Sequence, residues 1–442
     1  MLSKFRLNLI SLIYLFLSLS LLFYTSYKSE IIHDGIKASF YAKYYIFSFI
    51  LILISFVSFF LKKNIQQNLF LSVLSSYLIL FTVDVLLENN IFNQINFKKY
   101  EFQTKREYDR RDRYQIFNDT KKLNTEVKIT LPPSHLYKYN KEIYPLAGIS
   151  NSETINCNEN GEYSYFTSDR FGFNNPDTEW DKKNKLITII GDSYGMGSCV
   201  SRPFDIASNL RKKIKNNFSV INLAYGGNNL LVEYASLREY FEIIESKYII
   251  WLIYEDDSGE LDQLSNTILK KYLSDENFSQ FLPKKQKIID EHLNNILSQK
   301  TLEYKKNKDL TKKAIKSFKL YNLRNLFRVY NLNYTKFGIY AKQIIKKVKK
   351  VSDNNNSNLI VVYVPSVKTI KTGKLDNINK SSLIEILKQE NIDYINLDQM
   401  FLDPKDYAEY FPILTPGHYN ELGYKKISQI IYKYIRNKFN VL

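Results

Sequence analysis

The stretch "LITIIGDSYGMGSCV", residues 186–200, decides the fold class of this chain. It begins with five almost entirely apolar residues, which is typical of a strand covered on both faces in a parallel sheet. Gly191, Asp192 and Ser193 then lead from that strand toward a helix. Backbone N–H groups at such a helix start surround Ser193, where they can stabilise an attacking alkoxide and a developing oxyanion. In the alternative interpretation, Asp192 and Ser193 only cap the helix.

Four more apolar runs follow the same pattern, and each is bounded by Gly, Pro, Asn or Asp. The spacers after the first two strands, such as "PFDIASNLRKKIKNN" and "LVEYASLREYFEIIE", have helical character. This alternation predicts an α/β domain with a doubly wound parallel sheet, whose site lies at the carboxyl ends of the strands. The four runs are "SVINLAYGG" (219–227), "KYIIWLIYE" (247–255), "NLIVVYVPS" (358–366) and "IDYINLD" (392–398).

The first 92 residues contain three apolar stretches, at about 7–27, 44–61 and 68–87. Each is long enough to cross ~30 Å of hydrocarbon as a helix. No small-residue cleavage site follows the first stretch, which disfavours a signal peptide. Lysines flank the spans on both sides, so charge alone does not orient them. The sequence therefore predicts a multi-pass membrane region with its two ends on opposite sides of the bilayer.

The rest of the chain divides into a charged juxtamembrane segment at 93–130 and a large domain at 131–442. A Lys-rich insertion at about 261–350 has helical spacing, and we expect a helical cap or a surface for a partner. The 442 residues carry a net charge of +17. Lys-rich, scattered charge without zinc-ligand spacing, an RNA-binding signature or an Arg-rich recognition helix argues against nucleic acid as a partner.

Three motif blocks resemble those of the SGNH/GDSL hydrolases, a family of flavodoxin-like α/β/α esterases and acyl-transfer enzymes. The block "GDSYGMG" implies that Ser193 is the nucleophile and that its N–H contributes to an oxyanion hole. The block "NLAYGGNN" implies a second backbone donor at Gly227. The block "GHYNELGY" implies that His418, just before the C-terminal helix, is the general base. The three blocks occur in the order that the family has.

Two blocks depart from the family pattern. Where the family offers an Asn side chain as oxyanion donor, this chain has "WLIYEDDSGEL", so Asp257, or Asp256 with a shift of one residue, takes that place. A buried, protonated carboxyl would replace the missing donor. In the alternative, both aspartates turn away and Asn228 or Asn229 donates.

The second departure concerns the acid of the catalytic triad. The family places an Asp shortly before its histidine, whereas this chain has Thr415 and Pro416 before His418. A Ser–His dyad is sufficient for nucleophilic catalysis in principle. The histidine would then be oriented by a backbone carbonyl or by one of three acids that fold back toward it. Those acids are Asp403, Asp406 and Glu409.

The two cysteines, Cys157 and Cys199, lack metal-ligand spacing. In an oxidising compartment they would form a disulfide between the segment before the first block and the loop after Ser193, whereas in the cytoplasm they would be buried thiols. The stretch "CNENGEYSYFTSDRFGFNN", residues 157–175, resembles the lead-in of membrane-anchored bacterial members, whose catalytic domain lies outside the cytoplasm. This resemblance implies an inner-membrane protein with an extracytoplasmic domain.

These patterns together predict a membrane-anchored serine esterase without metal or organic cofactor. Its substrate would be an acyl ester, including acetyl, of a cell-envelope glycan or lipid. One alternative is an O-acyltransferase, in which a sugar hydroxyl replaces water as the acceptor. The other is a membrane scaffold that kept the fold but is catalytically impaired, as the altered blocks would explain. The sequence leaves the oligomeric state and the acyl group open.

Overall fold

The computed structural model describes most of the chain and divides it into two compact units. One unit comprises Met1–Ile91 with Thr311–Tyr330, and the other comprises Phe92–Leu310 with Asn331–Leu442. The described residues are 9–32, 38–88, 91–133, 142–214, 218–258, 267–307, 310–324, 337–400, 407–413 and 417–439.

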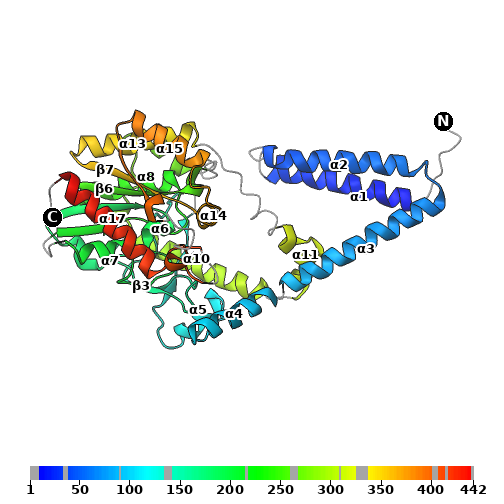
Figure 1. Ribbon diagram of the computed structural model, residues 1–442, viewed down its shortest axis with the longest axis horizontal. Coiled ribbons are helices and arrows are strands. Elements are labelled where there is room, and N and C mark those ends of the chain that lie inside the picture. The colour runs from blue at the N-terminus through cyan, green and yellow to red at the C-terminus, as the bar shows by residue number, and fades with distance from the viewer. Residues whose placement is uncertain are drawn as a thin grey trace. The chain divides into compact units, whose positions relative to one another are not determined.

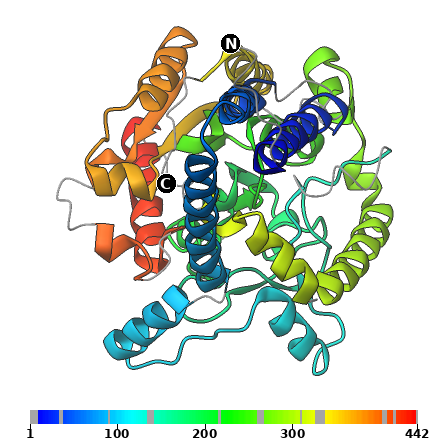
Figure 2. The same cartoon turned by 90° about the vertical axis from the view of Figure 1, so that its right-hand side faces the viewer.

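The N-terminal unit contains the three predicted apolar helices. Helices α1 and α2 lie side by side (Figure 1, Figure 2), and α2 is followed directly by α3. Candidate membrane spans cover Leu9–Ile31, Tyr41–Ser58 and Lys63–Leu87. The prediction of three long apolar helices is confirmed, with boundaries shifted by a few residues. The unit consists of α1 (Leu9–Ser26), a π-helix (Tyr27–Ile32), α2 (Ala38–Ser58), α3 (Lys63–Glu88) and α11 (Leu310–Phe318).

Several polar side chains within these helices are hydrogen-bonded to one another or to a backbone carbonyl. Gln66 donates from Nε2 to Ser58 O at 2.7 Å and to Ser11 Oγ at 3.3 Å. The hydroxyl oxygens of Ser18 and Ser55 lie 3.5 Å apart. A membrane offers no water to such groups, so contacts between helices are the way to satisfy them.

The Lys-rich insertion contributes to both units. Its helix α11 belongs to the N-terminal unit, where Tyr77 on α3 donates from its hydroxyl to Phe318 O at 2.7 Å. Asp84, the acid that interrupts the third apolar stretch, accepts from Leu323 N at 2.8 Å and from Asn322 Nδ2 at 3.1 Å. The acid in an apolar helix is thereby hydrogen-bonded to the insertion.

The C-terminal unit is built on a parallel sheet of five strands with the order β5-β4-β6-β7-β8. All its neighbouring strands pair in parallel, for example Ile190 with Trp251 and Trp251 with Val361. Nearly every residue of the central strands is buried, as the continuous apolar runs predict. The strands are β4 (Asn184–Gly191), β5 (Phe218–Asn222), β6 (Tyr248–Tyr254), β7 (Asn358–Val364) and β8 (Asp393–Asn396).

Helices cover both faces of this sheet, so the predicted doubly wound α/β fold is confirmed. Helices α8 and α13 pack together on one face, and α7 packs with α17 on the other (Figure 1). The helices are α6 (Ser193–Met196), α7 (Ile206–Arg211), α8 (Leu230–Tyr240), α9 (Thr267–Ser274), α10 (Gln286–Asn307), α13 (Ile339–Asn354), α14 (Val367–Thr372), α15 (Ile378–Gln389), α16 (Tyr407–Tyr410) and α17 (Glu421–Phe439). Short 3₁₀ helices cover Asp177–Trp180, Phe241–Ile243, Glu255–Ser258, Leu282–Lys284 and Leu397–Met400.

A small second sheet precedes the main one in the chain and was not expected from the sequence. Its strand β2 pairs in parallel with β1 and antiparallel with β3, and residues 156–164 connect β2 to β3. We call residues 156–164 the lead-in loop. Strands of two or three residues are too short to leave a periodic pattern in the sequence. This part contains α4 (Ile91–Thr104), α5 (Arg113–Lys121), β1 (Lys128–Ile129), β2 (Glu153–Ile155) and β3 (Tyr165–Thr167).

Candidate active site

The turn that carries Ser193 is formed by close packing at the carboxyl end of β4. A Cβ on Gly191 would lie 2.9 Å from Leu252 O, and a Cβ on Gly195 would lie 2.7 Å from Ala224 Cβ. Larger residues at these two positions would push β4 and α6 away from the neighbouring strands. The glycines on either side of Ser193 therefore let the chain turn sharply from strand to helix.

Asp192 caps the short helix α6 that begins at Ser193. Its Oδ1 accepts from Tyr194 N at 2.8 Å, while Ser193 Oγ lies 3.4 Å from its Oδ2. The helix cap of the alternative interpretation, in which Asp192 and Ser193 only cap the helix, is thus present for Asp192. It does not occupy Ser193, whose hydroxyl oxygen has a much closer partner.

That partner is His418. Its Nε2 lies 2.9 Å from Ser193 Oγ, so the structure joins the predicted nucleophile and the predicted base by a hydrogen bond. His418 precedes α17, whose start is held by Asn420 Oδ1, an acceptor for Gly423 N at 3.0 Å. Tyr194 ties the two blocks together because its hydroxyl donates to Gly417 O at 2.6 Å.

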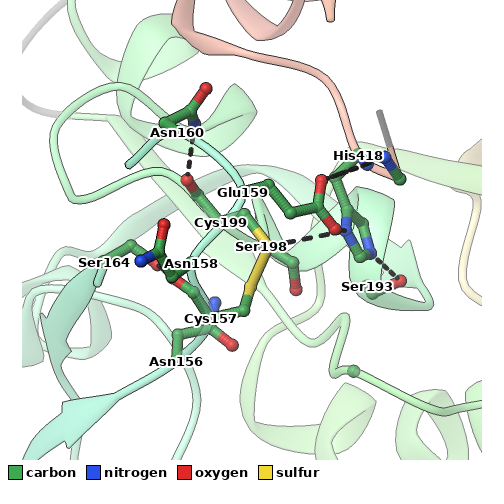
Figure 3. The surroundings of a disulfide bond; sticks show 12 residues. Asn156, Cys157, Asn158, Glu159, Asn160, Ser164, Ser193, Ser198, Cys199 and His418 are labelled. Atoms are coloured by element: carbon green, nitrogen blue, oxygen red, sulfur yellow. Dashed lines mark hydrogen bonds and ion pairs between the residues drawn. A yellow bond between two sulfur atoms is a disulfide. The ribbon is translucent and has the colours of Figure 1, made fainter. Parts of the chain in front are cut away.

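The second ring nitrogen of His418 contacts Glu159, a residue that the sequence analysis did not identify. Glu159 Oε1 lies 2.9 Å from His418 Nδ1, and Figure 3 shows the three side chains in line. Glu159 Oε2 accepts from the backbone N–H groups of His418 and Gly417 at 2.7 and 3.1 Å. With a proton on Nδ1 facing the carboxylate, Nε2 is free to accept the Ser193 hydroxyl proton, which is the arrangement of a Ser–His–acid triad.

Of the three acids considered from the sequence, the structure describes only Glu409, and its described contacts do not include His418. Glu409 is exposed on α16, while Asp403, Asp406, Thr415 and Pro416 lie outside the described residues. The position of Glu159 in the chain explains why it was missed. It lies 259 residues before His418, and no local motif connects them. The available signal was its place two residues after Cys157, a cysteine considered as a partner of the loop after Ser193.

Cys157 and Cys199 form a disulfide bond (Figure 3). Cys199 Sγ lies 3.5 Å from His418 Nδ1, so the bond packs against the imidazole. Glu159, Cys199 and His418 bring ligand-type atoms within 4.8 Å of one another. The sulfur carries no thiolate charge in the disulfide, and the carboxylate and imidazole are hydrogen-bonded to each other, so this group fits a triad better than a metal centre.

The second block lies beside the nucleophile. A Cβ on Gly226 would be 3.9 Å from Ser193 Cβ, and Gly227 has a φ of 82°. The two asparagines that follow have different environments. Asn229 caps α8 through its Oδ1, which accepts from Leu231 N at 3.1 Å and from Val232 N at 3.2 Å.

Asn228 is 6% exposed, and among the described residues no hydrogen bond satisfies its Oδ1. Its Nδ2 makes only a long contact of 3.5 Å to Gly191 O, at the end of β4. Because buried amides are normally well hydrogen-bonded, Oδ1 is open to a further donor, and the Nδ2 amino group, with two N–H donors and one long contact, is open to a further acceptor.

The third block begins at the carboxyl end of β6, and its acids have structural contacts. Asp257 accepts from Tyr254 N at 2.8 Å through Oδ2, and the side chain of Asp256 lies outside the described set. Glu255 is buried, and it accepts from Ser366 N at 2.7 Å and from Asn377 Nδ2 at 2.8 Å. The acidic run thus holds together the loops that follow β6 and β7.

Two carboxyls are buried behind the nucleophile. Burial raises the pKa of Asp192 to about 6, against the hydrogen bond from Tyr194 N. Burial, reinforced by the nearby Asp192, raises the pKa of Glu233 well above its ordinary value. Trp251 Nε1 donates to Glu233 Oε2 at 2.7 Å. The turn at Ser193 is therefore next to two carboxyls whose burial favours their protonated, neutral form in the folded protein.

In comparisons with known proteins, no family model and no curated protein matches this chain, whereas solved structures do. A lipase/acylhydrolase from Enterococcus faecalis is 12% identical with a TM-score of 0.34, covering 58% of this chain and 96% of its own. A putative lipolytic protein of the G-D-S-L family from Desulfitobacterium hafniense is 13% identical (TM-score 0.31; 57% and 99%). The esterase EstA from Pseudoalteromonas sp. is 15% identical (TM-score 0.29; 59% and 100%). These solved structures are of lipolytic proteins and esterases. At this level of identity and TM-score they say nothing of the reaction of this chain.

We expect the substitution Asp192→Asn to change how stability depends on pH. A carboxyl with a raised pKa stabilises the fold fully below the pKa of the unfolded chain, ~4, and this contribution is lost as pH rises through about 6. Asn keeps an oxygen for the cap and carries no charge. Relative to the unsubstituted protein, the variant should gain ~2 kcal/mol of unfolding free energy between pH 4 and pH 7.

Urea unfolding in detergent at the two pH values measures this difference. Asp275→Asn, a change at an exposed turn residue, is the matched control and should leave the difference unchanged. Parallel pH dependence in Asp192→Asn and the unsubstituted protein would contradict the assignment.

Proposed function

We propose that this chain is a membrane-anchored serine ester hydrolase in which Ser193, His418 and Glu159 form the catalytic triad. The observation that carries the proposal is the continuous chain of contacts from Ser193 Oγ to His418 Nε2 and from His418 Nδ1 to Glu159 Oε1, both 2.9 Å long. A scaffold without catalysis has no need for a serine, an imidazole and a carboxylate held in this order.

The reaction follows from these contacts. Ser193 Oγ attacks the ester carbonyl while His418 Nε2 takes the hydroxyl proton, and Glu159 stabilises the imidazolium that forms. Collapse of the tetrahedral intermediate breaks the bond to the alcohol, which receives the proton from His418. Water then attacks the acyl-enzyme by the same route, and the chemistry of these steps requires no cofactor.

The developing oxyanion needs donors on the opposite side of the carbonyl from the base. We assign the backbone N–H groups of Ser193 and Gly227, as the motif blocks imply, together with the side-chain amide of Asn228. Asn228 is buried, and its Nδ2 amino group has two N–H donors with one long contact of 3.5 Å to Gly191 O at the end of β4, whereas Asp257 already accepts a backbone N–H. In this assignment the second block supplies the side-chain donor that the third block lacks.

A glycan ester is the substrate class that the surroundings favour. A cavity of about 430 Å³ is lined by Asn160 and Asn420, which flank the triad in sequence, and by Cys199. Its wall also combines tyrosine rings with charged groups, among them Tyr163 and Glu162. The lining also includes apolar side chains such as Phe411 and Leu422 and does not include Ser193 or His418. Ring faces next to hydrogen-bonding groups support a sugar in this neighbouring cavity, whose volume is that of a small-molecule site.

The compartment follows from the disulfide and the anchor. A disulfide next to the site persists in an oxidising environment and is rare in the cytoplasm. We therefore assign the C-terminal unit to the outside of the cytoplasmic membrane, which the apolar helices span.

The triad assignment predicts that Ser193→Ala abolishes ester hydrolysis and that Glu159→Gln lowers kcat by ~10²–10⁴-fold with a smaller change in KM. The amide of Gln presents a donor to Nδ1 and so favours the wrong tautomer of His418. The measurements are hydrolysis of p-nitrophenyl acetate and labelling by a fluorophosphonate probe, on the full chain in detergent.

Glu409→Gln makes the same chemical change at an exposed acid near the histidine loop, and its kcat should stay within about twofold of the unsubstituted value. Equal activity of Ser193→Ala and the unsubstituted protein would remove the enzyme assignment. Loss of activity in Glu409→Gln but not in Glu159→Gln would transfer the role of the acid.

The oxyanion assignment predicts that Asn228→Ala lowers kcat by ~10²–10³-fold, the usual effect of removing one donor. Asp257→Asn retains an oxygen for Tyr254 N and should leave both kcat and its pH profile unchanged. A gain of activity at high pH in Asp257→Asn, with Asn228→Ala unaffected, would instead make Asp257 the donor.

The topology assignment predicts that a phosphatase reporter fused after Leu442 is active in cells, because this reporter matures only outside the cytoplasm. A reporter fused within residues 59–62, between α2 and α3, should be inactive, and one fused within 33–37 should be active, because each span crosses the membrane once. The opposite pattern would place the C-terminal unit in the cytoplasm.

A further inference from the structure

The catalytic acid of this site is carried by a loop outside the main sheet. Glu159 belongs to the lead-in loop, residues 156–164, between β2 and β3. Ser193, in contrast, lies at the end of β4 in the main sheet, and His418 lies just before α17. The distance between Glu159 and the imidazole therefore depends on whatever fixes the lead-in loop against the domain.

One covalent bond fixes it at this point. Cys157, two residues before Glu159, is bonded to Cys199, six residues after Ser193. Figure 3 shows the bond beside the imidazole, with Glu159 and Cys199 approaching His418 from the same side. The contact of 3.5 Å between Cys199 Sγ and His418 Nδ1 places the sulfur at the nitrogen that Glu159 binds.

Apart from the bonds that the Glu159 carboxylate itself makes with His418 and Gly417, the described hydrogen bonds of the lead-in loop are between neutral groups. Asn160 Nδ2 donates to Cys199 O at 3.0 Å, and it is a single neutral hydrogen bond. Gly161 N binds Asn158 Oδ1 within the loop, and Asn158 Nδ2 binds Asp109 O, on the segment before it. These contacts shape the loop, and the disulfide is the covalent tie that holds its backbone, two residues from Glu159, against the segment after Ser193.

We infer that the Cys157–Cys199 disulfide is a positioning element for the catalytic acid, so that the oxidised protein is the fully active form. The inference rests on the proposed function of Ser193, His418 and Glu159. It assigns the disulfide an effect on the chemical step, mediated by Glu159, in addition to any effect on stability.

A disulfide that only stabilises the fold behaves differently in a variant that has already lost its acid. If the disulfide acts through Glu159, its removal from the Glu159→Gln variant has no further effect on kcat, because the acid that it positions is already absent. If the bond acts on the fold in general, its removal lowers the activity by the same factor with or without Glu159. The two roles therefore separate in a double-mutant cycle.

The experiment compares four full-length proteins in detergent: the unsubstituted chain, Cys157→Ala/Cys199→Ala, Glu159→Gln and the triple variant. We expect loss of the disulfide to lower kcat for p-nitrophenyl acetate by at least ~10-fold, with KM changed by less than about twofold. In the Glu159→Gln background the same loss should change kcat by less than about twofold. Equal factors in the two backgrounds, or no loss in either, overturn the inference.

Arg202→Met is the matched control for weakened packing. Arg202 Nη2 donates to Thr167 O at 2.9 Å, so this change breaks a tie between the segment after Cys199 and β3, the strand that follows the lead-in loop. Its kcat should stay within about twofold of the unsubstituted value. A loss of kcat as large as that of the cysteine variant means that weakened packing lowers the activity without any change at Glu159, and it overturns the inference.

A measurement on the folded protein covers the case in which the cysteine variant does not fold. Dithiothreitol reduces the bond to two thiols as the reagent closes to its cyclic disulfide. The low-field proton resonance of His418 Nδ1–H, which reports the hydrogen bond to Glu159, should disappear on reduction and return on reoxidation. A resonance that persists in the reduced, folded protein overturns the inference.

This readout also separates the inference from the proposed function. Failure of the oxidised protein to react with a fluorophosphonate at Ser193 would contradict the proposed function, whatever the resonance does. Reaction at Ser193 that proceeds equally fast in the oxidised and the reduced protein would contradict the positioning role and leave the proposed function in place.

Discussion

In the proposed triad the imidazole of His418 must be held from two sides at once, and the contacts of the site match this requirement. Nε2 needs Ser193, at the end of the second strand in the sheet, and Nδ1 needs an acid. The parallel sheet presents the serine at its carboxyl edge, as α/β folds do. The acid comes instead from Glu159 in the lead-in loop, so two parts of the C-terminal unit have to be fixed together before the histidine can act.

The sequence predicted the part of this arrangement that is local. Continuous apolar runs indicated the five strands of the main sheet, and the turn at Ser193 and the helix start at His418 follow from residues that are neighbours in the chain. Glu159 was out of reach because its contact spans 259 residues and depends on strands of two or three residues. The proposal of a Ser–His dyad failed to include this acid for that reason, although Cys157 lies two residues away from it.

The third block illustrates a second limit. From the sequence, an acid at the end of β6 can be a protonated donor or an acceptor of backbone N–H groups. The two roles are distinguished only by the groups around the acid in the fold. Asp257 accepts from Tyr254 N, and Glu255 collects donors from the segments after β7. These acids therefore shape the loops at the sheet edge, and the proposed side-chain donor is instead Asn228, whose Nδ2 has one long contact, to Gly191 O at the end of β4.

A triad acid on the histidine's own loop is positioned by that loop, and its geometry is independent of the redox environment. Moving the acid to a distant segment removes this local constraint, because a flexible loop spends most of its time away from one productive geometry. A covalent link restores the constraint at the position where it is needed, but only where disulfides persist. In the proposed function the apolar helices and the disulfide act together: the helices place the domain outside the cytoplasm, where the disulfide persists, and the disulfide positions the acid.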